Sequence, residues 1–222
     1  TIRLLGDRNS VSARIAARLV AVAAAEPYAE VRSQLASSAR RLPVKTCLSI
    51  VQNLLSHDQD INDLHIPLLL WWAIEDKAIS ETDAVLRLVE SPDAWRLPLV
   101  RKFLIERLAR RLTAESTDDG YAACARLLTM APSDADVDLV LTGMLKAFSG
   151  RRIKNVPKSL QTALERLLER RNSDPKVMQF ALRMGASSAL AFRFIADVSR
   201  PAAERVAIIR TLGETRANGS TE

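Results

Sequence analysis

Near its start, the 222-residue chain carries Glu26-Pro27-Tyr28-Ala29-Glu30-Val31-Arg32. Proline is favoured in the first turn of a helix, where its missing N–H would have no partner within the helix, and it is harmful further along. The apolar residues that follow are spaced by four, four and three positions, which places them on one helical face. This stretch therefore predicts an amphipathic helix over 27–42, with the stripe Val31, Leu35, Ala39 and Leu42.

The same arrangement recurs along the chain. Almost all of the nine prolines precede or open a segment with apolar residues at helical spacing, and no convincing run alternates with period two. We therefore predict an all-α fold of about twelve helices joined by short loops. Their expected ranges are 10–25, 27–42, 44–57, 65–78, 81–91, 94–113, 118–131, 134–149, 156–172, 174–185, 187–198 and 201–214.

Capping residues support several of these boundaries. Ser80, Ser133 and Asp174 stand where a side chain would accept a hydrogen bond from the first helical turn. Gly150 and Gly185 stand where a left-handed residue commonly ends a helix.

Helix pairs that recur every 30 to 45 residues or so are typical of α-solenoids. The acid–proline start followed by Val31-Arg32 resembles the first helix of a HEAT repeat, and Asp174-Pro175-Lys176-Val177 is a fainter echo without the arginine. We predict a HEAT/armadillo-like α-solenoid as a single domain over 1–214, with a frayed tail at 215–222. A compact helical bundle would show the same periodicity.

Composition and charge exclude several classes of protein. Only seven glycines and 5% aromatic residues exclude collagen and most all-β folds. The longest apolar run, Ile66–Ile74, is too short to span a bilayer. The net charge of +6 divides into +5 for 1–50, −6 for 51–100, zero for 101–150 and +7 for 151–222. This pattern indicates a polarised surface, so we do not expect a nucleic-acid-binding groove.

Both histidines lie in the polar segment 57–65, where Asp58, Asp60 and Asn62 have the one-three-five spacing of a calcium loop. The match then fails, because the sixth position is not glycine and the twelfth is not glutamate. A zinc site would require the two histidines to converge across the loop. We therefore predict no metal ligands, and expect Asp and Asn side chains to bond backbone N–H groups and cap the helix that follows.

Trp71 and Trp72 are adjacent and so point about 100° apart on a helix, which means that they cannot both face the same core. Trp72 and Asp76 lie four residues apart on one face, and some HEAT-like DNA glycosylases hold a damaged base with a tryptophan and an aspartate so arranged. The surrounding region is acidic, so we expect core packing or a partner contact here, with base recognition as the alternative.

Other clusters carry little chemistry. Arg151, Arg152 and Lys154 follow a predicted helix end, where they complement its dipole and could contact an anion. Cys47 and Cys124 lie far apart in apolar segments and are expected to be buried. The chain has no phosphate loop, dinucleotide fingerprint or nucleophile motif. We therefore expect no enzymatic activity and no cofactor in this segment.

A wider resemblance involves three segments: 1–7 (Thr-Ile-Arg-Leu-Leu-Gly-Asp), 30–43 (Glu-Val-Arg-Ser-Gln-Leu-Ala-Ser-Ser-Ala-Arg-Arg-Leu-Pro) and 62–75 (Asn-Asp-Leu-His-Ile-Pro-Leu-Leu-Leu-Trp-Trp-Ala-Ile-Glu). Together they resemble the helical-repeat region of large bacterial proteins described as membrane-bound dehydrogenases, most closely over 1–150. In that family a sugar-dehydrogenase-like propeller precedes this region and a c-type cytochrome domain follows it. The resemblance implies a periplasmic or membrane-associated redox parent, and it transfers no catalytic or haem-binding residue.

The chain also begins without methionine, so we expect a segment of a longer protein. The function we predict for it is a non-catalytic scaffold that spaces or docks the propeller and cytochrome domains. The alternative is a nucleic-acid-binding HEAT protein of the DNA-glycosylase type. The candidate interaction surface comprises Trp71, Trp72, Asp76, Arg151, Arg152 and Lys154.

Overall fold

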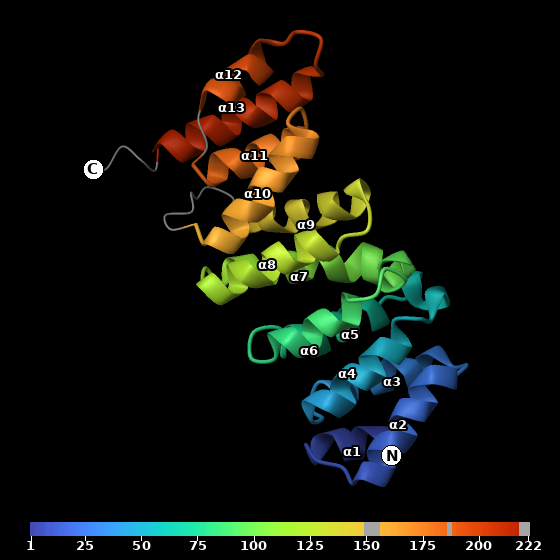
Figure 1. Ribbon diagram of the computed structural model, residues 1–222. Coiled ribbons are helices and arrows are strands. Elements are labelled where there is room, and N and C mark those ends of the chain that lie inside the picture. The colour runs from blue at the N-terminus through green and yellow to red at the C-terminus, as the bar shows by residue number, and fades with distance from the viewer. Residues whose placement is uncertain (149–155, 186–187, 218–222) are drawn as a thin grey trace.

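The computed structural model describes residues 1–148, 156–185 and 188–217. This part of the chain contains thirteen α-helices and no strand, which confirms the all-α class (Figure 1). The helices are α1 (Ile2–Asp7), α2 (Ala13–Ala25), α3 (Ala29–Ala39), α4 (Val44–Leu54), α5 (Ile66–Glu75), α6 (Thr82–Leu86), α7 (Ile105–Ala114), α8 (Asp118–Met130), α9 (Asp134–Ala147), α10 (Lys158–Arg171), α11 (Pro175–Arg183), α12 (Ser188–Ala196) and α13 (Ala202–Ala217).

Each predicted helical range contains a helix. The structure differs from the prediction mainly at short helical segments. The helix α1 was not predicted, and the predicted loop after α4 contains a 3-10 helix, η1 (Asp58–Asn62). The range 81–91 holds α6 followed by the 3-10 turn η2 (Arg87–Val89). At the C-terminal end, α13 continues through Ala217, beyond the expected end at 214.

The prediction of one continuous helix over 94–113 is wrong. The structure has a 3-10 turn η3 (Ala94–Arg96), then a π-helical turn η4 (Val100–Leu104) that leads into α7. Between them Leu97 is extended, with φ −63° and ψ 127°. Leu97 precedes Pro98, whose ring disfavours the helical conformation at the residue before it, and the extended Leu97 interrupts the helix at this point.

The predicted caps fare differently. The Ser133 hydroxyl accepts a hydrogen bond from the Asp136 N–H, and Asp174 accepts from the N–H groups of Lys176 and Val177. Gly185 has φ 87° after the end of α11, as a left-handed cap requires. The Ser80 prediction is wrong, because α6 begins after Glu81 without a side-chain cap. Gly150 lies outside the described residues.

The helices pack mainly on their second neighbours along the chain. One layer, here called the odd layer, consists of α1, α3, α5, α7, α9, α11 and α13, each of which contacts the next. On the other side α2 packs on α4, α6 on α8, and α8 on α10, and these form the even layer. Figure 1 shows the result as a stack that runs from α1 and α2 at one end to α12 and α13 at the other.

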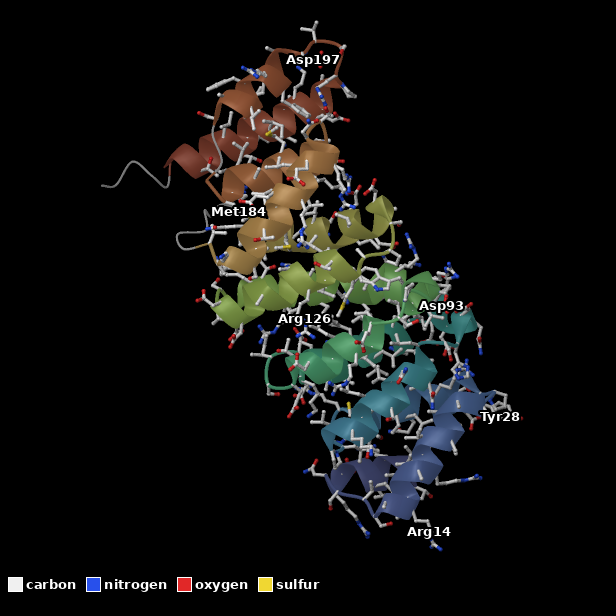
Figure 2. All side chains as sticks on the ribbon, viewed as in Figure 1. Arg14, Tyr28, Asp93, Arg126, Met184 and Asp197 are labelled. Atoms are coloured by element: carbon white, nitrogen blue, oxygen red, sulfur yellow. The ribbon has the colours of Figure 1, made fainter. Side chains whose placement is uncertain are left out.

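The core follows this stack instead of gathering at one centre. One cluster of buried apolar residues extends from Leu19 to Ala181, and a second, formed by α11, α12 and α13, is centred on Phe194 and Ile208. Ion pairs join neighbouring helices around it. Arg126 of α8, labelled in Figure 2, pairs with Asp83 of α6 at 2.5 Å. None of the described helices combines the length and the apolar composition that a bilayer-spanning segment needs.

The contact between α7 and α9 depends on a glycine. A Cβ at Gly143 would lie 2.2 Å from the carbonyl oxygen of Glu106 and 2.9 Å from the Cβ of Ala109. Because both neighbours are on the facing helix and one is backbone, they cannot move aside without separating the two helices.

We therefore expect Gly143→Ala to lower the free energy of unfolding by about 1–3 kcal/mol, the usual cost of overpacking. Urea denaturation followed by circular dichroism measures it. Gly213→Ala in α13 is the matched control, because nothing lies within 4 Å of its Cβ position and alanine favours a helix by roughly 1 kcal/mol. Equal effects of the two substitutions would contradict this account of α7 and α9.

Candidate interaction surface

A buried arginine determines the geometry of the N-terminal third. Arg32 of α3 is 2% exposed, and its Nε and Nη2 donate to the two carboxylate oxygens of Asp60 at 2.6 and 2.5 Å. Its Nη1 donates to the backbone carbonyl of Glu26, at the end of α2. The hydrogen bond with Asp60 raises the pKa of the guanidinium. One side chain thus ties α2, α3 and the connection between α4 and α5.

This pairing also disfavours the calcium-loop interpretation of 58–62. Asp60 points into the protein and is bound by Arg32, whereas Asp58 is exposed to solvent. Asn62 accepts a hydrogen bond from Lys102. The three oxygen-bearing side chains therefore point in different directions and do not surround a common point.

The two histidines do not converge either. His57 Nε2 lies 2.8 Å from the carbonyl oxygen of Ala23, and its Nδ1 contacts Gln59. His65 is the N-cap residue of α5. An Asp of this segment caps α5, as expected. It is Asp63, which accepts from the N–H groups of Ile66 and His65 at 2.8 Å each, and these bonds lower its pKa. In the described part of the chain, no group of three His, Cys, Asp or Glu side chains is arranged for a metal ion.

The adjacent tryptophans divide as their helical spacing requires. Trp71 is 9% exposed and packs in an apolar pocket formed with Leu55, Pro67 and Phe103, among others. Trp72 is 49% exposed. Of the two, therefore, only Trp72 belongs to a surface that a partner could contact.

Trp72 lies in a groove of about 280 Å³ between α3 and α5, here called the α3–α5 groove. Its apolar wall includes Leu64 and Leu68, which are exposed like Trp72, so three large apolar side chains face solvent together. The opposite wall is polar and comes from successive turns of α3. The remaining lining residues are Glu30, Ser33, Gln34, Ser37, His65 and Leu69.

Asp76 does not present a free carboxylate beside Trp72. Its Oδ2 accepts from Lys77 Nζ at 2.6 Å, and its Oδ1 accepts from Arg40 Nε at 3.3 Å. The bond from Lys77, assisted by Arg40, lowers the pKa of Asp76 in spite of its partial burial. A carboxylate held in this way stays ionised and paired, an arrangement typical of a structural contact between α3 and α5.

A larger hollow, of about 780 Å³, lies further along the odd layer and is here called the α7–α13 hollow. Its lining residues come from α7, α9, α11 and α13: Arg110, Thr142, Leu145, Lys146, Pro175, Lys176, Gln179, Ala203, Glu204 and Ala207. The depression therefore crosses four successive helices of the odd layer.

The cations around this hollow are largely paired. Lys146 forms an ion pair with Glu106, and the Nζ of Lys176 lies 3.6 Å from Asp138. Among the described residues, Arg110 is the lining cation without an ion pair. The α7–α13 hollow is therefore mixed in charge and does not have the uniformly basic lining expected for a polyanion site.

The remaining predicted residues add little to either surface. Arg151, Arg152 and Lys154 lie outside the described residues. Cys47 and Cys124 are both fully buried, and burial raises the pKa of the first thiol to about 11 and of the second to about 12. Since the thiolate is the nucleophile, neither cysteine is a reactive group near neutral pH.

Comparison with family models, with curated proteins and with solved structures finds no significant match for this chain. The resemblance to the helical region of membrane-bound dehydrogenases therefore stays a prediction.

Sequence reasoning missed several residues of this region. The partner of Arg32 was not identified, although Asp60 was considered for another role. Trp95 was not singled out; it is fully buried and donates from Nε1 to the Val89 carbonyl at 2.7 Å. Exposure of Leu64 and Tyr28 was not foreseen, and Figure 2 shows Tyr28 at the edge of the stack, directed away from it. No local signal distinguishes these apolar residues from core residues.

Breaking the buried pair should be costly. We expect Arg32→Met to lower the free energy of unfolding by about 3–5 kcal/mol, because it leaves the Asp60 carboxylate buried without its cation. The double variant Arg32→Met, Asp60→Leu should recover much of this loss, since neither charge is then buried. Urea denaturation of the parent chain, the single variant and the double variant measures the three free energies of unfolding.

The control for this pair is Arg40→Ala, which removes the exposed partner of Asp76 and should cost less than about 1 kcal/mol. An Arg32→Met cost no larger than that of the control would contradict the central role of the buried pair.

The two tryptophans should respond in opposite ways. Trp71→Ala should cost about 3–5 kcal/mol, because it empties a packed apolar site, whereas Trp72→Ala should change the stability by less than roughly 1 kcal/mol. Acrylamide quenching offers a second measurement. Trp72→Phe should remove the fluorescence component that acrylamide quenches most strongly, and Trp95→Phe should remove the component that it quenches least. Stronger quenching of Trp71 than of Trp72 would contradict the assignment.

Proposed function

We propose that the chain is a HEAT/armadillo-like α-solenoid over 1–214 that acts as a non-catalytic interaction scaffold. The observation that carries the proposal is the packing of helices on their second neighbours, which builds two layers and leaves one side of the odd layer hollowed across four helices. The concave face of a solenoid is its usual binding surface.

The chemistry of the surface favours binding over catalysis. The α3–α5 groove offers exposed apolar side chains beside hydroxyl and amide groups, a combination suited to another protein surface. Asp76, the residue that a base-recognising enzyme would need free, is held by Lys77 and Arg40. Together with the family resemblance, these features support a role in spacing or docking the propeller and cytochrome domains of a larger redox protein in the bacterial envelope.

The solenoid arrangement can be tested by small-angle X-ray scattering. A compact domain of this length would have a radius of gyration of about 17 Å. We expect a clearly larger value, with a distance distribution skewed towards long distances, because the stack is elongated (Figure 1). A symmetric distribution with a radius near that of a compact domain would refute the solenoid.

The docking role can be tested by titrating the full chain with purified propeller and cytochrome segments from the parent reading frame. Trp72→Ala and Leu68→Asp should weaken association by about tenfold if the α3–α5 groove is the docking surface. Arg126→Ala, on α8 of the even layer (Figure 2), is the control and should have no effect. No association with either segment would contradict the docking role.

The same samples can be titrated with duplex DNA to test the alternative function. We expect no binding at low salt, because the cations of the α7–α13 hollow are mostly paired. Binding that weakens steeply between about 50 and 200 mM salt would instead favour the nucleic-acid-binding alternative.

A further inference from the structure

The end of the stack formed by α12 and α13 exposes an unusual amount of apolar surface. Leu190 and Phe192 of α12 are 44% and 50% exposed, and Val206 and Ile209 of α13 are 43% and 50% exposed. Figure 1 places these two helices last in the stack, with no other described helix beyond them. Terminal units of stacked helical proteins normally carry a polar outer face, which keeps them soluble.

The helix α13 is apolar on two sides. Ile208 and Leu212 face inward and pack against α11 and α12. A second stripe, spaced by four, three and four residues, is exposed on another side of the helix and consists of Ala202, Val206, Ile209 and Gly213. At 100° per residue, the two stripes lie on different sides of α13. A helix with apolar residues on both sides is typical of one that packs against neighbours on both.

Gly213 provides a second, independent observation. At Gly6, Gly120 and Gly143, an added Cβ would come within 3.0 Å of a neighbouring atom, so these glycines permit close contacts inside the chain. At Gly213 no described atom lies within 4 Å of the Cβ position. Glycine inside a helix is unfavourable relative to alanine, and nothing in the described part of this chain requires it at 213. The close approach of a helix from outside would account for it.

The charges beside the stripe define the partner. On the helical wheel, Arg205 and Arg210 lie on either side of the outer stripe. The Nε of Arg205 is buried without a hydrogen-bond partner among the described residues. Two copies of this face would bring arginines together, and the other end of the stack, formed by α1 and α2, exposes Arg3, Arg8, Arg14 and Arg18. Charge repulsion therefore opposes both the pairing of two α13 faces and the end-to-end stacking of two copies. Acidic side chains of another protein would instead be attracted to Arg205 and Arg210.

We propose that the outer face of α13 is a docking site for an amphipathic α-helix of a partner protein, with an apolar stripe flanked by Asp or Glu. The partner stripe packs along Val206 and Ile209, approaches the backbone of α13 closely at Gly213, and places its carboxylates beside Arg205 and Arg210. This inference rests on the proposed scaffold function and assigns it a second surface, separate from the α3–α5 groove.

The probe is a fluorescein-labelled synthetic 18-residue helix with leucine at the stripe positions and glutamate beside them, titrated into the full chain by fluorescence anisotropy. A peptide of the same pattern with lysine in place of glutamate is its counterpart. We expect the glutamate peptide to bind about tenfold more tightly than the lysine peptide. Ile209→Asp and Gly213→Leu should each weaken binding by about tenfold or more.

Charge reversal separates a docking role from a structural one. The double variant Arg205→Glu, Arg210→Glu should invert the preference, so that the lysine peptide binds more tightly. Each variant must first show an unfolding midpoint in urea close to that of the parent chain. Ser188→Asp, on the same end of the stack but outside the stripe, is the matched control and should leave binding unchanged.

Equal binding of the two peptides, or binding that persists in both Ile209→Asp and Gly213→Leu, would overturn the proposal. So would sedimentation showing a dimer of the parent chain that Ile209→Asp abolishes, since a second copy would then occupy the face. The titrations with propeller and cytochrome segments test the α3–α5 groove through Trp72 and Leu68. If only the peptides fail to bind at α13, the proposed scaffold function therefore still stands. If both the segments and the peptides fail to bind, the proposed function is removed.

Discussion

The buried guanidinium of Arg32 is the interaction on which the N-terminal third depends. It binds both oxygens of Asp60 and the carbonyl of Glu26, so α3, the end of α2 and the connection between α4 and α5 meet at one planar group. Lysine could not replace it, because a single ammonium cannot match a carboxylate with two parallel bonds and reach a third acceptor. Through Asp60 this contact positions η1, and with it the start of α5 and the side of that helix on which Trp72 is exposed.

In the rest of the stack most helices pack on their second neighbours, and ion pairs join several of them. Arg41 reaches Asp7, Arg40 reaches Asp76 and Arg101 reaches Asp136 across successive helices of the odd layer. Many basic side chains are therefore held in ion pairs within the protein. The net charge of +6 consequently does not describe a free basic surface, which is why the hollow across α7, α9, α11 and α13 has a mixed lining.

Local signals identified the helices because they act within one helical turn. Pro67 and Pro175 occupy the first turns of α5 and α11, and Ser133 and Asp174 cap their helices as expected. The prediction of one continuous helix over 94–113 also failed for a local reason, since Pro98 disfavours the helical conformation at Leu97, which is extended. At the candidate site, the 100° rotation between adjacent helical residues predicted that Trp71 and Trp72 would face different surroundings. It did not predict which of the two faces solvent.

The sequence by itself determined the all-α class, the position of nearly every helix and the separation of charge along the chain, because spacing, proline and capping act over a few residues. Only the tertiary structure decided that Asp60 pairs with Arg32, that Trp72 joins Leu64 and Leu68 in a groove, and that α13 keeps an apolar face exposed. These outcomes depend on which helices become neighbours. An apolar stripe is the same in the sequence whether a second helix covers it or water does.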